Sequence, residues 1–368
     1  MHYARTLLLV ALLLLAGCAE RSASTHSTPR PLPTATTEPS PTRTPRIVFL
    51  DVGQGDSALI QFANGQTMLI DGGETDQGAG LVARLRQLGV RQLDWVVASH
   101  AHSDHIGGLI QVLRELPVKE VWDSGFRHDS PVYLDYLRAV RSARAPDGGR
   151  RKFRVVKHGE RLSVGTDATV EVLAPSQPYL TDTRSDPNNN SIVLRITFGS
   201  VRVLFTGDME REQRNRLYRE RADLRAEILK VAHHGAHNGT DSEFLRRVQP
   251  KVAVISCGLN NRYGHPHRET LQALRGAGVK LYRTDLHGEV QITLSGAQLQ
   301  VATTRRPPDA AEAHSPTERT RLIGNRNTKV YHAPDCNRLP RPENRVLFNS
   351  RQQAESAGYR AHAQCLGE

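Results

Sequence analysis

The sequence lacks any apolar run long enough to cross a lipid bilayer. Its most apolar stretch, Leu7–Ala16, is far shorter than the roughly 20 residues of a spanning helix. Arg5 precedes this stretch, and Gly17 and Cys18 follow it, which is the layout of a secretory signal peptide. We therefore expect an exported protein.

Residues 15–18 read Leu-Ala-Gly-Cys and resemble the lipobox of bacterial lipoproteins, in which the cysteine carries the lipid. The resemblance implies that residues 1–18 are a lipoprotein signal peptide and that Cys18 is the lipidation site. We expect an extracytoplasmic protein, lipid-anchored to a bacterial membrane at the cell surface or in the periplasm. The alternative is an ordinary cleaved signal peptide in which Cys18 is incidental.

Cysteine is also scarce, with four in 368 residues, which excludes a scaffold held together by many disulfide bonds. Cys257 follows the apolar run Val252–Ser256 and is predicted to be a buried core thiol. Cys336 and Cys365 each stand near a histidine and are treated below as metal ligands.

Large apolar residues are nearly absent from two segments, which therefore cannot bury enough surface to fold. Residues 19–45 are rich in Ser, Thr and Pro and predict an extended linker. Residues 304–319 predict a second linker. The two segments delimit a large region at 46–303 and a small region at 320–368.

The large region has the element pattern of an α/β protein. Short apolar runs alternate with turn signals and predict buried strands. These runs are Ile47–Leu50, Ala58–Phe62, Thr67–Ile70, Trp95–Ala98, Ile192–Phe198, Val201–Phe205, Ile228–Ala232 and Val252–Ser256. Leucines at helical spacing before Gly89, and before Gly276 or Gly278, predict helices between strands. The pattern predicts sheets covered by helices.

Three histidines and one aspartate occur in the run His100-Ala101-His102-Ser103-Asp104-His105. The run follows the predicted strand Trp95–Ala98 and so lies at the carboxyl end of that strand. Core packing cannot explain so many polar groups, because each would need a partner. Imidazole is a preferred ligand of zinc, and a carboxylate balances the charge of the ion. The pattern H-x-H-x-D-H therefore predicts a metal site.

This pattern, followed by two glycines, resembles the metallo-β-lactamase superfamily. The rest of the region resembles the hydrolase domain of ComEC-type competence proteins, which act in DNA uptake. The matching segments are Asp51–Ser57, Ile70–Gly73, Ser99–Gly108, Asn188–Leu194, Thr206–Asp208, Leu229–Gly235 and Asn261–His267. The resemblance implies an α/β fold, the αββα sandwich, with the metal site at one edge between the sheets. The polytopic membrane part of a competence protein has no counterpart in the sequence.

The resemblance also implies a set of metal ligands. His100 and His102 would hold a first ion, Asp104 and His105 would hold a second, and Asp208 would bridge the two. The alternative role for Asp208 is the N-cap of a helix that follows it.

The second ion needs a further ligand after the predicted strand Ile228–Ala232. We prefer His233, the first residue past that strand, with His234 as the second choice. Asp71 and Asp56 are expected to orient the metal ligands without binding the metal themselves. Asp71 would do so by accepting a hydrogen bond from an imidazole N–H. The alternative for Asp71 is a turn aspartate in the run Asp-Gly-Gly.

The histidine that the wider superfamily places between His105 and Asp208 is missing. The sequence reads Asn188-Asn189-Asn190-Ser191 there, as in the ComEC-type branch, and Asn190 is the proposed ligand. An amide oxygen is a harder and weaker ligand than imidazole. We therefore expect either a loosely held first ion or a preference shifted from zinc toward manganese.

One or two divalent ions, zinc or manganese, would supply hydroxide by lowering the pKa of bound water toward about 7. Two ions could also hold the attacking and leaving oxygens of a displacement at phosphorus. We assign catalytic roles to Asp104 and Asp208, of which Asp208 would position the hydroxide. His265 is a candidate leaving-group acid or phosphate contact; the alternative is a loop histidine held by Pro266.

The small region contains a second set of metal-ligand residues. His332 and Cys336 form one close pair and His362 and Cys365 form another, which suits a structural zinc ion. The region resembles the metal-binding domain of Ada-type DNA repair proteins, which normally uses four cysteines. The resemblance implies a small α+β module stabilised by zinc, without alkyl transfer to a thiolate. A disulfide between Cys336 and Cys365 is the alternative.

Together these features predict a metal-dependent phosphodiester hydrolase, an extracytoplasmic DNA nuclease related to hydrolases of competence and DNA uptake. The expected partners are DNA, a membrane and the DNA-uptake machinery, and the chain is expected to be monomeric. The net charge of +11, from 49 Lys and Arg against 38 Asp and Glu, favours a polyanionic partner, although a solvated basic surface is the alternative. Two alternatives remain. The chain could be a hydrolase of the same fold that acts on a phosphocholine ester or a lactone, or it could be a non-catalytic DNA receptor.

Overall fold

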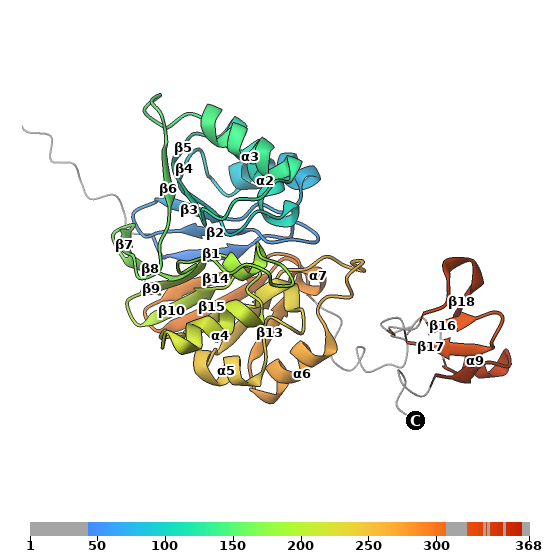
Figure 1. The fold of residues 1–368 in the computed structure, drawn as a ribbon. Helices are drawn as coiled ribbons and strands as arrows, with labels where there is room; N and C mark the ends of the chain where they lie inside the picture. Colours follow the sequence, from blue (N-terminus) through green and yellow to red (C-terminus); the bar gives the residue numbers. More distant parts are fainter. Residues whose placement is uncertain (1–42, 307–321, 334–335, 337–338, 349–350, 363–368) are drawn as a thin grey trace, which may run out of the picture. The chain divides into compact units, whose positions relative to one another are not determined.

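A computed structural model describes residues 43–306, 322–333, 336, 339–348 and 351–362. The larger part contains two sheets packed face to face (Figure 1). The eight-stranded sheet has the order β15 (Gln298–Thr303), β14 (Val290–Ser295), β1 (Arg46–Phe49), β2 (Ala58–Gln61), β3 (Thr67–Ile70), β4 (Leu93–Ala98), β5 (Val118–Asp123) and β6 (Lys152–Val155). The seven-stranded sheet has the order β13 (Lys280–Arg283), β12 (Val252–Ile255), β11 (Ile228–Lys230), β10 (Val201–Phe205), β9 (Val193–Phe198), β8 (Ala168–Ala174) and β7 (Arg161–Val164).

Helices cover the outer face of each sheet (Figure 1). The first sheet carries α1 (Gly78–Gln87), α2 (Ser103–Glu115) and α3 (Pro131–Ser142). The second carries α4 (Arg211–Arg219), α5 (Ser242–Val248) and α6 (Arg268–Gly276), and the short α7 (Thr284–His287) follows β13. The predicted αββα sandwich is confirmed.

Strand β4 shows how the sequence produces these layers. All of its residues are buried, and successive side chains point to opposite faces of the sheet. Trp95 and Val97 pack between the sheets, whereas Val96 and Ala98 pack under the helices. The polar run that begins at Ser99 therefore emerges at the edge of the sandwich.

Several strands gave no apolar run in the sequence. The outer strands β6 and β15 read KFRV and QLQVAT, and their residues are largely exposed or half-buried. An edge strand with a solvated face needs few large apolar residues, so its sequence resembles a loop. Cys257 is fully buried under the helices of the second sheet, as predicted. Within the described residues, no helix has the length and apolar character needed to cross a membrane.

The C-terminal module has its own four-stranded sheet, in the order β18 (Arg345–Phe348), β16 (Leu322–Asn325), β17 (Val330–His332) and β19 (Arg360–Ala361), together with α9 (Arg351–Ser356). Its small core contains Leu322, Tyr331, Phe348, Ala354 and Tyr359. This is the predicted α+β module, and so small a core favours an additional metal crosslink. The predicted lipidation site Cys18 and the predicted zinc ligand Cys365 lie outside the described residues.

Candidate metal centre

The predicted histidine and aspartate ligands meet at one edge of the sandwich. From the first sheet, the run 100–105 follows β4 and enters the first turn of α2. From the second sheet, Asp208 follows β10, and His233 and His234 follow β11. Because β10 and β11 are parallel neighbours, the residues after them lie side by side, facing the run that follows β4.

Asp208 lies at the centre of this cluster and is 2 % exposed. Its Oδ1 is 3.2 Å from Nε2 of His105, and its Oδ2 is 3.8 Å from Nε2 of His100. The carboxylate therefore faces imidazoles of both predicted ligand sets, as a bridging ligand would. The alternative role as a helix cap is wrong, because α4 begins at Arg211 and has Glu210 as its N-cap residue.

His234, the second choice, belongs to the buried cluster. Its Nε2 lies 3.1 Å from Oδ2 of Asp104 and 3.4 Å from Oδ2 of Asp208. The preferred His233 has a side chain that is 22 % exposed, with Nε2 3.8 Å from Asp208 Oδ2 and Nδ1 3.3 Å from Asn238 Oδ1. Both histidines have a φ of 51°, and this tight turn directs consecutive side chains to different sides. The geometry therefore favours His234 over His233 at the second position.

At the first position, Nε2 of His100 and Nδ1 of His102 lie 3.0 Å apart. Two nitrogens this close can bind a single ion.

The expectation that Asn190 completes this position is wrong. Its amide donates to the carbonyls of Leu180 and Asp186 and accepts from the Leu180 N–H, so both amide atoms are used within its own loop. Asn188 lines the metal cleft instead. Its Nδ2 donates to Glu210, and its Oδ1 is buried without a hydrogen-bond partner in the described structure.

Asp71 fixes the loop that begins at Ser99 and carries the ligands in the run 100–105. It accepts from the Ser99 N–H at 2.8 Å and from the Ser99 hydroxyl at 2.7 Å, and its Oδ2 lies 2.9 Å from Nδ1 of His105. A carboxylate on Nδ1 turns Nε2 toward the metal position. The contacts suit the orienting role better than that of a simple turn residue.

Asp56 lies close enough to the metal position to be a ligand, but its carboxylate has other partners. Its carboxylate, His105, Asp208 and His234 have ligand atoms within 4.8 Å of one another, which would suit a direct ligand. However, Asp56 approaches Nδ1 of His234 at 3.2 Å and forms an ion pair with the buried Lys230. Because Nδ1 is the rear nitrogen of this ring and the charge of Asp56 is already balanced, we assign Asp56 an orienting role and keep Asp104 as the ligand.

Burial and mutual charge set the protonation of the cluster. Burial opposes ionisation of Asp208, but the imidazoles of His105, His234 and His233 outweigh it and hold the Asp208 pKa well below its ordinary value. Burial would lower the pKa of His105, but the surrounding carboxylates raise that pKa well above normal. Burial dominates at His100, whose pKa is well below normal. Asp208 is therefore ionised and His100 is neutral, which are the forms that bind metal, whereas His105 and His234 hold protons that a bound cation would displace.

The ligand atoms of the cluster have the properties of a divalent-cation site. Nε2 of His105, Nε2 of His234, Oδ1 of Asp208 and Oδ1 of Asn188 are buried and make no hydrogen bond of normal geometry in the described part of the chain. The two imidazole nitrogens lie 3.1–3.4 Å from carboxylate oxygens of Asp104 and Asp208. Such atoms are costly unless something binds them. Imidazole nitrogen and carboxylate oxygen suit zinc and manganese.

The cluster opens into a cleft of about 330 Å³. The cleft is lined by Gln54, Glu74, His102, Ser103, Asp104, Asn188, Asp208, His233, His234, Arg262, Tyr263 and His265. The rings of His265 and Tyr263 are stacked, with centroids 5.6 Å apart and planes at 21°. Burial and the neighbouring histidines lower the pKa of His265 to about 3. A neutral ring favours the phosphate contact among its predicted roles.

Sequence reasoning missed Lys230, Asn188 and Arg262. Lys230 is the one charged residue of the buried strand β11, which reads ILK, and this was a usable signal because a buried lysine needs a partner. Asn188 is one of three consecutive asparagines, and Arg262 is one of many exposed arginines, so neither could be recognised from the sequence.

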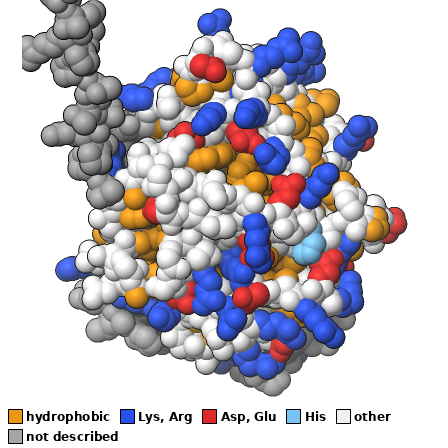
Figure 2. Space-filling view, turned by 90° about the vertical axis from the view of Figure 1, so that its left-hand side faces the viewer, with side chains coloured by type: hydrophobic (Ala, Val, Ile, Leu, Met, Phe, Trp, Pro, Cys, Tyr) orange, Lys and Arg blue, Asp and Glu red, His pale blue; other side chains and the backbone are white. Residues whose placement is uncertain are grey.

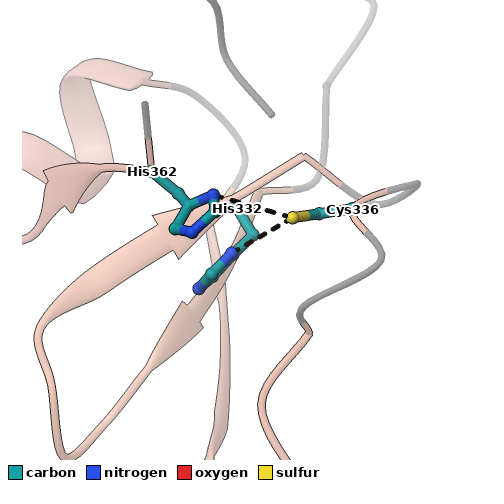
Figure 3. Close-up of side chains that lie close together, drawn as sticks. All are labelled: His332, Cys336 and His362. Atoms are coloured by element: carbon teal, nitrogen blue, oxygen red, sulfur yellow. Dashed lines mark hydrogen bonds between the residues drawn. The ribbon is translucent and has the colours of Figure 1, made fainter. Parts of the chain in front are cut away.

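In the C-terminal module, three of the four predicted zinc ligands converge (Figure 3). Sγ of Cys336 lies 3.4 Å from Nδ1 of His332 and 3.8 Å from Nδ1 of His362. The ligand atoms of the three residues lie within 4.8 Å of one another. One sulfur and two imidazole nitrogens in this arrangement fit a zinc ion.

Comparison with known proteins places both parts in families. Residues 50–259 match the metallo-beta-lactamase superfamily, and residues 311–368 match the metal binding domain of Ada. ComE operon protein 3 of Bacillus subtilis (strain 168) is 32 % identical over 264 residues, covering 66 % of this chain and 32 % of that protein. Competence protein ComA of Neisseria gonorrhoeae is 30 % identical over 249 residues, covering 67 % and 32 %. The chain thus spans about a third of the length of these relatives.

Among solved structures, CmlA, a diiron beta-hydroxylase from Streptomyces venezuelae, is similar with 17 % identity and a TM-score of 0.46, covering 70 % of this chain and 55 % of that one. The family matches confirm both resemblances predicted from the motifs. The chain therefore belongs to the metallo-β-lactamase superfamily and carries a module of the Ada metal-binding type.

Proposed function

We propose that the chain is a metal-dependent phosphodiesterase that cuts DNA outside the cytoplasm, held to a bacterial membrane by a lipid on Cys18. The observation that carries the hydrolase proposal is the buried cluster of imidazole and carboxylate ligand atoms around Asp208, which opens into the cleft. A relative named as a competence protein supports DNA as the substrate. The net charge of +11 agrees with a polyanionic substrate.

Bound divalent ions would supply a hydroxide nucleophile at neutral pH. Asp208, which faces the imidazoles of both ligand sets, would orient that nucleophile. Arg262 and His265 line the cleft, where the guanidinium would balance phosphate charge and the neutral imidazole would donate a hydrogen bond to a phosphate oxygen.

The C-terminal module would help to hold DNA. Its exposed arginines include Arg341, Arg345 and Arg360, and such side chains contact phosphates without regard to sequence. Deletion of the module should therefore weaken DNA binding most at low salt.

The test uses the purified chain loaded with zinc or manganese. We expect it to hydrolyse bis-(p-nitrophenyl) phosphate and to cut DNA, and we expect Asp208→Ala and His102→Ala to lower both rates by at least about 100-fold. The control is Asp135→Ala, which removes a half-exposed carboxylate on α3. Turnover of the small ester without DNA cleavage would assign the centre to a small phosphodiester. A metal-loaded protein that hydrolyses neither would refute the proposal.

The anchor is tested separately by cell fractionation. Cys18→Ser should move the protein from the membrane fraction to the soluble extracytoplasmic fraction. Retention of the variant in the membrane fraction would exclude lipid on Cys18 as the anchor.

A further inference from the structure

A second cationic surface lies on the outer edge of the first sheet. Strand β6 is the last strand of that sheet and runs parallel to β5, which in turn runs parallel to β4. The metal ligands follow the carboxyl end of β4. The residues that lead into the amino end of β6 therefore lie toward the opposite end of the sheet from the metal centre.

A groove of about 360 Å³ lies between the end of α3 and the segment that enters β6. Its lining residues are Val140, Arg141, Ala143, Arg150, Arg151 and Phe153. None of them carries a carboxylate. Figure 2 looks onto this edge of the molecule, and Lys and Arg side chains gather near the top of the view, beside exposed apolar side chains.

In the part of the chain that the structure describes, the arginines of this groove are not held in ion pairs, unlike the arginines beside it. Their neighbours Arg138 and Arg154 are paired with Asp135 and Glu120, but no carboxylate in the described residues forms an ion pair with the three groove arginines. An arginine stays protonated at neutral pH. Because three like charges line one groove, binding an anion there would relieve their mutual repulsion.

One of these guanidinium groups has an unsatisfied donor as well. Nη1 of Arg151 is buried without a hydrogen-bond partner in the described structure, and burial lowers the pKa of Arg151. The nearest carboxylate in the sequence, Asp147, accepts from the Gly149 N–H in its own turn.

The groove also presents an aromatic ring to solvent. Phe153 is 45 % exposed, and Val155, on the same face of the strand, is 40 % exposed. A cationic groove with an exposed aromatic side chain is the combination that binds single-stranded nucleic acid, because arginines contact phosphates while bases stack on the ring.

We propose that this groove is a nucleic-acid exosite, which holds a strand by its phosphate backbone at a distance from the cleft and prefers single strands to duplex. The choice of nucleic acid over other polyanions rests on the proposed function. An exosite would raise the local concentration of DNA at the enzyme without taking part in cleavage.

The experiment measures binding of fluorescently labelled single- and double-stranded oligonucleotides to the full chain in the presence of chelator, so that no cleavage occurs. The test variant is Arg141→Glu combined with Arg150→Glu, two exposed positions. The matched control is Arg219→Glu combined with Arg275→Glu, which changes the net charge equally at exposed positions on α4 and α6. Turnover of bis-(p-nitrophenyl) phosphate in metal-loaded protein reports whether each variant is folded and active.

We expect the groove variant to bind single strands at least about tenfold more weakly at moderate salt. Its salt slope should fall by roughly 0.7 for each phosphate that an arginine no longer neutralises. The control should change binding less than about threefold, and small-ester turnover should stay the same in both. Phe153→Ala should weaken binding of single strands by about fivefold or more and binding of duplex less.

Equal weakening by the groove and control variants would overturn the proposal, because it would show an effect of net charge alone. Unchanged DNA binding by the groove variant, with loss of binding to vesicles containing phosphatidylserine, would overturn it in favour of a membrane contact. Failure of the proposed function would give a different result, in which the wild-type chain binds single strands through the groove but cuts no DNA.

Discussion

Replacing His234 with alanine tests the metal ligands most directly, because the adjacent His233 provides a matched control. His234 is 1 % exposed, and its Nε2 faces Asp104 at 3.1 Å and Asp208 at 3.4 Å. The side chain of His233 is 22 % exposed, and its closest approach to Asp208 is 3.8 Å. The same substitution at the two positions should therefore have unequal effects.

The size of the effect follows from burial and charge. Loss of a residue that only orients a metal ligand costs about 10–100-fold in affinity, so loss of a direct ligand should cost at least about 100-fold, or about 2.7 kcal/mol. Without metal, removing the imidazole leaves Asp104 and Asp208 with one fewer buried counter-charge, which costs about 3–5 kcal/mol of stability. Removing the partly solvated ring of His233 should cost about 1 kcal/mol.

The assay combines metal content after dialysis, turnover of bis-(p-nitrophenyl) phosphate and urea unfolding with and without chelator. We expect His234→Ala to retain less metal, to lose more than about 100-fold in turnover and to unfold at lower urea than His233→Ala. The reverse order of the two variants in metal content would refute the ligand assignment. Equal, small losses in both would place the second metal elsewhere.

Four other substitutions test individual residues. Asp71→Asn should lower metal affinity by about 10–100-fold without unfolding the protein, measured by competition with a chromogenic chelator, since the ring of a ligand loses its orienting partner; unchanged affinity would contradict the orienting role. Asn188→His should raise zinc affinity relative to manganese, because it adds an imidazole to the cleft; a loss of zinc affinity would place Asn188 outside the metal's reach. Burial raises the pKa of Asp123 from its ordinary 3.8 to about 6, so the free energy of unfolding falls as the pH rises through this window. Asp123→Asn should therefore increase the free energy of unfolding at pH 7 by up to about 3 kcal/mol, measured by urea unfolding. A variant with the wild-type pH profile would argue against this. Cys336→Ser should remove zinc from the C-terminal module and leave small-ester turnover unchanged, whereas loss of turnover would indicate that the two parts depend on each other.

The sequence by itself determined the fold class and the centre of the metal site. Apolar runs such as Thr67–Ile70 and Trp95–Ala98 predicted strands because buried strands need continuous apolar residues. The run 100–105 predicted metal chemistry because its histidines and aspartate are contiguous, so their proximity needs no knowledge of the fold. Exposed edge strands such as β6 were missed, since a solvated strand has no apolar run to mark it.

The tertiary structure decided which of several identical neighbours faces the metal. His233 and His234, like Asn188 and Asn190, have the same composition and nearly the same position in the sequence. Backbone turns send their side chains in different directions. The partnership of Asp56 with Lys230 and the arginine-lined groove at β6 likewise depend on which elements pack together. Local sequence specifies residue types, but the direction of a side chain and its long-range partner are set only when the sheets and helices assemble.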